Sequence, residues 1–116
     1  MSNQAALYDG KFVVSVVFSY DGRDYEAVSP TLVGSSAAVF CFFDAENPEV
    51  LVKVVDGGAI NGHWWVQIAG VTQMAVNVTV SQTETGKANT YRSAEGPFTP
   101  VTDFTAFDAP RPSSAP

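Results

Sequence analysis

The chain has 116 residues, of which 46% are hydrophobic and 16% are charged. This length and composition predict a single globular domain whose core is large enough to fold without covalent cross-links. Twelve acidic residues against six basic ones give a formal net charge of −6. This balance argues against nucleic acid and anionic membrane surfaces as partners, because both attract basic patches.

Simple features of the sequence also argue against a membrane span, a signal peptide, and a disulfide or thiolate zinc site. No apolar run approaches the roughly 20 residues that span a bilayer, so no membrane insertion is predicted. The start, MSNQAALYDG, lacks the basic and apolar segments of a signal peptide. The single cysteine, Cys41, excludes an intrachain disulfide and a zinc site built from several thiolates.

The first half of the chain predicts β-strands. Residues 11–20 place apolar side chains at every second position, which is the period of a half-buried strand. The Asp-Gly pair that follows predicts a two-residue hairpin, because this turn needs positive φ. Residues 23–28 are predicted as a short, charged edge strand, residues 29–36 as a loop, and residues 37–43 as a near-continuous apolar strand in the middle of a sheet.

The second half continues this pattern after a break at Asn47-Pro48. Strands are predicted over residues 50–55, 63–70, 72–80 and 87–92, with a last short strand over residues 103–107. Together these segments predict an all-β fold, an antiparallel β-sandwich of immunoglobulin-like architecture with seven to eight strands, with a small closed barrel as the alternative.

The expected domain boundaries follow from the strands. The β-sandwich is predicted over residues 10–107, preceded by an N-terminal extension over residues 1–9. Residues 108–116, DAPRPSSAP, are predicted to be a disordered tail because Pro, Ser and Ala offer little apolar surface to bury.

The stretches VFCFFDAENPEVLVKVVDGGAINGHWWVQIAG, VTVSQTETGKANTY and TDFTAF resemble a β-sandwich accessory module of bacterial exported multidomain proteins. The likeness covers roughly residues 10–107, and much of it is turn chemistry. It implies a non-catalytic module without an assigned activity, extracellular or at the cell surface as part of a longer protein. The sequence departs from the pattern at Cys41, where tryptophan is usual, at Gly58, where some members have cysteine or arginine, and at Gln67, where an aromatic residue is more usual.

Two adjacent tryptophans suggest a binding surface. In a regular strand Trp64 shares the core face with Val66 and Ile68, whereas His63, Trp65 and Gln67 share the other face. An indole between an imidazole and an amide is typical of surfaces that bind sugars or peptides, so these three residues are the predicted binding site. A bulge would reverse this assignment, and the simpler alternative is that Trp65 packs under a loop or the tail.

Other chemistries have weaker support. Asp44, Glu46 and Glu49, and separately Asp21 with Asp24, are candidate calcium ligands, although turn residues on an acidic surface explain both groups more simply. Cys41 is expected to be buried and inert rather than paired with the only histidine. No catalytic residues, enzyme activity or cofactor are predicted.

Three functions remain open. The first is a non-catalytic binding module that recognises carbohydrate or protein through the sheet face around Trp65. The second is a structural or self-assembly domain that forms homo-oligomers through strand edges or through an apolar sheet face containing Val13 and Val17. The third is an immunoglobulin-like protease inhibitor that presents the loop DGGAING to its target.

Overall fold

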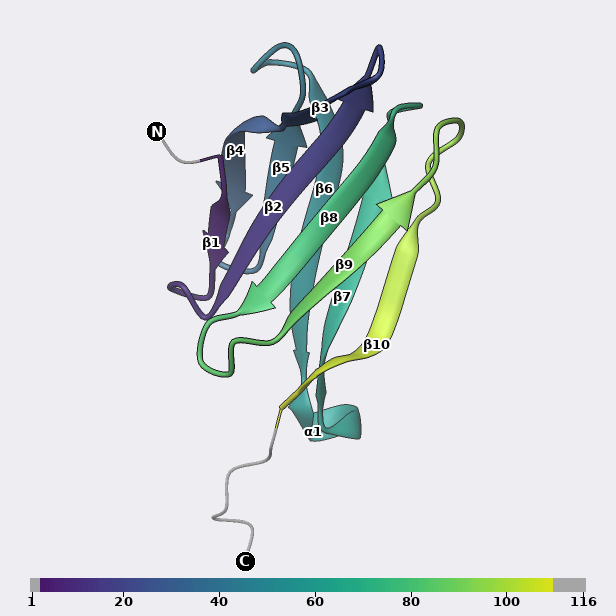
Figure 1. Ribbon diagram of the computed structural model, residues 1–116. Coiled ribbons are helices and arrows are strands. Elements are labelled where there is room, and N and C mark those ends of the chain that lie inside the picture. The colour runs from purple at the N-terminus through teal and green to yellow at the C-terminus, as the bar shows by residue number, and fades with distance from the viewer. Residues whose placement is uncertain (1–2, 110–116) are drawn as a thin grey trace, which may run out of the picture.

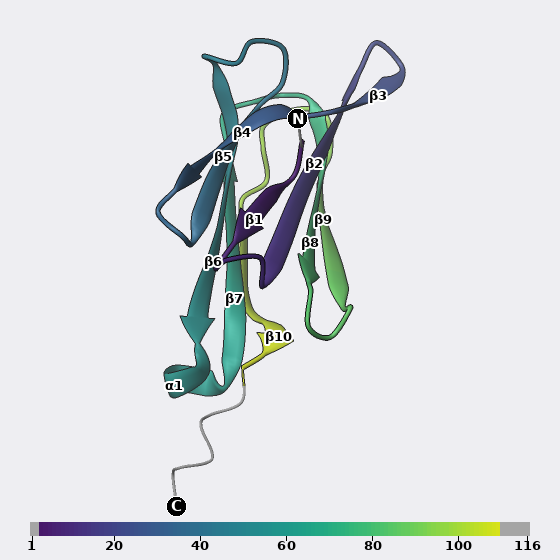
Figure 2. The ribbon, with the colours of Figure 1, turned by 90° about the vertical axis from the view of Figure 1, so that its left-hand side faces the viewer.

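The computed structural model describes residues 3–109, which form two antiparallel β-sheets packed face to face (Figures 1 and 2). The all-β sandwich is therefore confirmed, whereas the predicted count of seven to eight strands is wrong because residues 3–109 form ten. The elements are β1 (Ala5–Leu7), β2 (Phe12–Tyr20), β3 (Arg23–Glu26), β4 (Val28–Val33), β5 (Ala37–Cys41), β6 (Pro48–Gly57), α1 (Gly58–Asn61), β7 (His63–Gly70), β8 (Ala75–Gln82), β9 (Ala88–Ser93) and β10 (Val101–Asp108). Within residues 3–109 no helix has the length and apolar character needed to cross a membrane.

Sheet A has the strand order β1-β2-β8-β9, and β3 also pairs with β2. The long strand β2 organises this sheet: β1 pairs with its first three residues and β3 with its last four, both on the edge opposite β8. The hairpin between β2 and β3 is the predicted Asp-Gly turn, since Asp21 has φ 52° and Gly22 has φ 75°. Two positive φ values in succession match the twist of the flanking strands.

Sheet B has the strand order β10-β7-β6-β5-β4. Its central pair, β6 and β7, stays in register from Val50 opposite Gly70 to Gly57 opposite His63, without a bulge. Side chains therefore alternate between faces over the whole pair, and the buried valines of β6 are Val50, Val52 and Val54, as the alternation predicted.

The core lies between the sheets and is almost entirely apolar. Its largest fully buried side chains come from both sheets, which interleave aliphatic residues with rings, and include Phe12, Phe18, Phe40, Leu7, Val14, Val16, Val52, Val66 and Val78. Aromatic rings gather at the two ends of the sandwich. At the end that carries α1, called the helix end, Phe12 packs against Trp64 and Phe107. At the opposite end, called the hairpin end because it carries the β2–β3 turn, Phe18 stacks on Phe42.

Two strands were not predicted. Residues 5–7 lie within the expected extension but form β1, which pairs with β2 through only three residues. Residues 29–33 were predicted as loop but belong to β4, whose pairing with β5 shifts register between Val28 and Thr31. Pro30 lies inside this shift and cannot donate a ladder hydrogen bond, so the strand resembles a loop in sequence and is tolerated only at a sheet edge. At the other terminus β10 includes Asp108, and residues 110–116 of the predicted tail lie outside the described residues.

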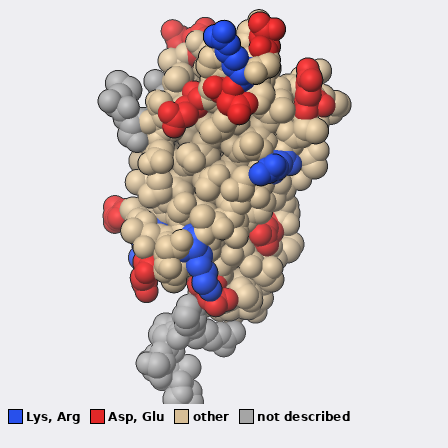
Figure 3. Space-filling view, viewed as in Figure 1, with Lys and Arg blue, Asp and Glu red and all other residues tan. Residues whose placement is uncertain are grey.

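The outer face of sheet A carries small, mostly uncharged side chains. Figure 3 shows this face, with few charged residues over its middle and carboxylates gathered near the hairpin end. Val13 and Val17, which were considered for self-assembly, are partly buried on it. Thr79 and Thr90 form a cross-strand hydrogen bond of 3.0 Å between their hydroxyl groups.

Side-chain hydrogen bonds join the edge strands β9 and β10, which belong to different sheets. The Tyr91 hydroxyl donates to Asp103 Oδ2 at 2.7 Å, and Asn89 Nδ2 donates to the carbonyl of Ala106 at 2.8 Å. Burial, and after it the hydrogen bond to Asp103, raises the pKa of Tyr91 above its ordinary value of 10.0. These contacts cover one open side of the sandwich.

We expect Tyr91→Phe to lower the free energy of unfolding at pH 7 by about 1.5 kcal/mol, because a hydrogen bond to a carboxylate is lost. The raised pKa also means that unfolded Tyr91 loses its proton at lower pH than folded Tyr91. Its contribution is therefore complete below about pH 10 and declines as pH rises above that value. The free energy of unfolding should be measured with urea between pH 7 and 11. It should fall less over this range in Tyr91→Phe than in Tyr20→Phe, which changes an exposed tyrosine and serves as the control. Equal alkaline losses would contradict this assignment.

Candidate functional site

The two tryptophans point to opposite faces of sheet B. Trp64 faces the core, where its ring meets Tyr8 at 5.0 Å and Phe12 at 4.8 Å between centroids. Trp65 lies on the outer face, opposite Val55 in the unshifted β6–β7 ladder. No bulge reverses the alternation, so the predicted grouping of His63, Trp65 and Gln67 on one face follows directly from the register.

Trp65 is held by its neighbours on the outer face. Its Nε1–H donates to Asn61 Oδ1 at 2.9 Å, and Phe104 packs edge-to-face against its ring with centroids 4.9 Å apart. The indole also lies across Gly57, where an added Cβ would approach the ring to 2.3 Å. The sequence did not reveal the contact with Phe104, because it arises where the β10–β7 register shifts between Asp103 and Phe107.

His63 lies at the helix end of the same face. Its Nδ1 is 3.6 Å from Asp108 Oδ1, which is an ion-pair distance but too long for a hydrogen bond. The buried Nδ1 consequently has no hydrogen-bond partner among the described residues. His63 thus borders the outer face beside β10 and is separated from Gln67 by three residues of β7.

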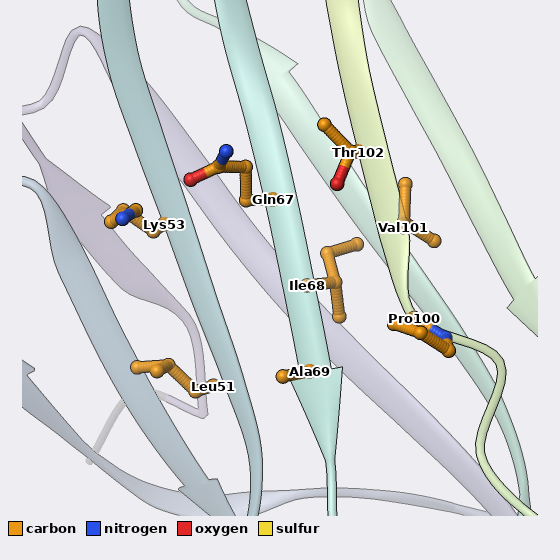
Figure 4. Close-up of a pocket in the computed structure, with 8 residues that line it drawn as sticks. All are labelled: Leu51, Lys53, Gln67, Ile68, Ala69, Pro100, Val101 and Thr102. Carbon is orange, nitrogen blue, oxygen red and sulfur yellow. The ribbon is translucent and has the colours of Figure 1, made fainter.

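Gln67 lines a shallow hollow on the outer face of sheet B (Figure 4). The hollow measures about 300 Å³ and combines an apolar floor with three polar side chains; its lining residues are Leu51, Lys53, Gln67, Ile68, Ala69, Pro100, Val101 and Thr102. A second hollow of about 260 Å³ shares Leu51 and Ala69 with the first and continues toward Val39, Pro48 and Val71. The two hollows adjoin at Leu51 and Ala69.

The predicted calcium ligands serve the turn between β5 and β6. Asp44 Oδ1 accepts a hydrogen bond from the backbone N–H of Glu46 at 2.9 Å, and the Asp44 carbonyl accepts one from the N–H of Asn47. Burial raises the pKa of the Glu49 carboxyl above its ordinary value of 4.5, and the Asn47 side-chain amide donates to Glu49 Oε2 at 3.4 Å. In the part of the chain that the structure describes, no group of three or more His, Cys, Asp or Glu side chains is placed to hold a metal ion.

Cys41 and His63 do not form a nucleophilic pair. Cys41 pairs with Pro48 and His63 with Gly57, at opposite ends of β6, so about 30 Å separates them. The thiol is buried, donates to the Ala45 carbonyl at 3.4 Å, and has a raised pKa, chiefly because burial disfavours the thiolate. Cys41 is therefore a small apolar core residue.

No protein-family model, curated protein or solved structure matches the chain. The resemblance to an accessory module thus remains a hypothesis, and the outer face of sheet B has to be interpreted from its own geometry. Its main features are the Trp65–Phe104 pair and the adjoining hollows, which together we call the outer-face site. Sequence alternation identified Trp65 and Gln67, whereas Phe104, Pro100 and Thr102 reach the site only through the pairing of β10 with β7.

We expect Gly57→Ala to displace the Trp65 indole, because the new methyl group would occupy the position of the ring and also lie 2.7 Å from the His63 carbonyl. Stability should fall by about 1–3 kcal/mol, as in other overpacked sites. In NMR spectra the Trp65 Nε1–H resonance should shift, since its hydrogen bond to Asn61 is lost. Gly86→Ala is the control: a Cβ there meets open space, and any effect reports backbone strain alone. An unchanged Trp65 resonance in Gly57→Ala would contradict the packing described.

Proposed function

We propose that this protein is a non-catalytic binding module that engages a partner polypeptide through the outer-face site of sheet B. The observation that carries the proposal is a pair of adjoining hollows on the outer face of sheet B, of which the first combines an apolar floor with the polar groups of Lys53, Gln67 and Thr102. Binding sites commonly combine a concave apolar surface with a few polar groups that set orientation.

The charge and size of the outer-face site also suit a polypeptide. Lys53 is the only charged residue that lines the first hollow, and Glu49 lines the second. A volume of about 300 Å³ accommodates one or two side chains of a peptide lying across the strands. Leu51 is 40% and Val71 79% exposed, so burying them against a partner would remove apolar surface from water.

Carbohydrate is the second candidate ligand. Phe104 is half exposed beside Trp65, and an accessible ring next to hydrogen-bonding groups is a feature of sugar-binding surfaces. The polypeptide is favoured for two reasons. The Trp65 N–H is already bonded to Asn61, and the floor of the hollows is aliphatic rather than aromatic.

Self-association has one specific observation in its favour. Leu32 and Val33 are 52% and 53% exposed on β4, which is the edge strand of sheet B beyond β5. An edge with unpaired backbone groups and apolar side chains is a template for pairing with a second copy. Pro30 and the register shift shorten this edge, which limits such pairing.

The protease-inhibitor hypothesis gains no such support. The loop DGGAING folds into the helical turn α1, and Gly62 accepts a hydrogen bond from the backbone N–H of Ala109. An inhibitor that fills a protease cleft presents an extended segment, as other peptides do when they add to a strand. We retain the proposal that the module acts outside the cell in a longer bacterial protein, and this rests on the sequence resemblance alone.

The outer-face site is tested by selecting ligands from a random peptide library and a glycan array. Ala69 lines both hollows and is exposed, so Ala69→Arg should fill the site without disturbing the core. We expect selected ligands to bind Ala69→Arg at least tenfold more weakly, a loss of about 1.4 kcal/mol. The matched control, Thr90→Arg on the outer face of sheet A, should bind as the wild type does. Ligands that bind Ala69→Arg unchanged, or the absence of any ligand, would refute the site.

The self-assembly alternative predicts a mass that rises with concentration in light scattering. Val33→Lys should abolish that rise, because a lysine on an edge strand opposes pairing. A monomer at every concentration would remove this alternative and leave the outer-face proposal intact.

A further inference from the structure

The first hollow of the outer-face site lies between two rows of side chains that run across the strands of sheet B (Figure 4). One row is polar. The register places Lys53 of β6 opposite Gln67 of β7, and Gln67 opposite Thr102 of β10. Residues directly opposite one another project from the same face, so these three side chains stand side by side, about 5 Å apart from strand to strand.

The second row is apolar. Leu51 lies opposite Ala69 in the same ladder, and Pro100, which immediately precedes β10, borders the hollow with them. Leu51 and Ala69 are two residues away from Lys53 and Gln67 along their strands, so roughly 7 Å separates the two rows. Leu51 and Ala69 are both exposed, so this row keeps apolar surface in contact with water.

The polar row has unused hydrogen-bonding capacity. Within residues 3–109 the side chains of Lys53, Gln67 and Thr102 have no hydrogen-bond or ion-pair partner. An ammonium group, an amide and a hydroxyl group together offer more N–H and O–H donors than acceptors. A ligand group that accepts hydrogen bonds therefore suits this row.

Lys53 gives the first hollow a positive charge, although the chain as a whole carries a net charge of −6. It is the only charged residue that lines this hollow. Its neighbours on the same face of sheet B are all uncharged; they are Ala37 and Gln67 on the adjacent strands and Leu51 and Val55 along β6.

Carboxylates at the two ends of this face lie too far away to neutralise Lys53. Glu49 precedes Lys53 by four residues along β6, and Asp108 lies at the level of Gly57, four residues beyond Lys53. Each is thus roughly 13 Å away or more, whereas the Debye length at physiological salt is about 8 Å. Asp103 points into the sandwich, where it accepts a hydrogen bond. The charge of Lys53 is therefore available to a ligand.

We propose that the outer-face site recognises an acidic side chain next to an apolar side chain in its partner polypeptide. The carboxylate binds between Lys53 and Gln67 and accepts their N–H groups, while the apolar side chain covers Leu51 and Ala69. In an extended segment that lies across the strands, consecutive side chains point to opposite sides, one toward each row. This inference names the ligand chemistry of the outer-face site and therefore rests on the proposed function.

The test is an NMR titration of the whole, isotope-labelled chain with a short peptide that has glutamate and leucine side by side at its centre and serine elsewhere. Both ends of the peptide are capped, so glutamate is its only charge. We expect amide shifts in β6, β7 and β10, and at least threefold tighter binding than for peptides with glutamine or lysine in place of glutamate. A peptide with serine in place of leucine should also bind at least threefold more weakly, because it buries less apolar surface.

Substitutions of lysine separate the charge at the hollow from the net charge of the protein. Lys53→Met keeps the aliphatic stem and should make the glutamate and glutamine peptides bind equally, whereas Lys53→Glu should favour the lysine peptide. Lys11→Met is the matched control: Lys11 is an exposed lysine that precedes β2 of sheet A, and its loss changes the net charge by the same amount. The preference for glutamate should survive in this control. Lys53 is also exposed, so the thermal transition of each variant should stay close to that of the wild type.

Three results would overturn the acidic preference: equal binding of the glutamate and glutamine peptides to the wild type, an unchanged preference in Lys53→Met, or no amide shifts at millimolar glutamate peptide. None of them refutes the outer-face site itself if peptides selected from the random library still lose affinity in Ala69→Arg. A library that yields no ligand sensitive to Ala69→Arg would instead refute the site. The two failures are therefore distinguishable.

Discussion

The unshifted pairing of β6 with β7 is the constraint on which the rest of this structure depends. The eight residue pairs from Val50–Gly70 to Gly57–His63 contain no bulge. The register therefore determines, for each residue of these two strands, whether its side chain points to the core or to the outer face of sheet B. Valines of β6 and Trp64, Val66 and Ile68 of β7 fill the core, and the alternate residues form the outer-face site. A slip of one residue would bury Lys53 and Gln67 and expose the valines, so the core and the candidate site specify one another.

The two ends of the sandwich show how aromatic residues close a β-sandwich. At the helix end Trp64 and Phe12 are packed by Tyr8, whose hydroxyl donates to the Val54 carbonyl at 2.7 Å, so the rings there belong to the core. At the hairpin end the β2–β3 hairpin and the turn after β5 cover only Phe18 and Phe42. The remaining rings, Tyr20, Tyr25 and Phe43, stay about half exposed. Core packing therefore accounts for the rings at the helix end. The rings at the hairpin end expose more apolar surface than is needed to close the sandwich.

Much of the fold was predictable because its central strands alternate strongly. The valines of β6 and β8 and the apolar positions of β2 match a period of two, and the Asp-Gly hairpin requires a specific backbone conformation. The strands β1 and β4 were missed because each is stabilised by its neighbours rather than by its own pattern. The first has three residues, and the second contains Pro30 at a register shift. Local sequence carries no signal for pairing of this kind.

The candidate binding residues were likewise predictable from the sequence only in part. By itself the sequence predicted that Trp65 and Gln67 share a face opposite to Trp64 in a regular strand, and the unshifted β6–β7 ladder decided that no bulge reverses this. The sequence also determined the acidic character of the turns near Asp21 and Asp44. Only the tertiary structure decided that Phe104 packs on Trp65 and that Phe43 meets Tyr20, because these contacts join residues that lie 39 and 23 positions apart in the chain. Such neighbours arise from how the two sheets and their connections pack, and no local pattern encodes them.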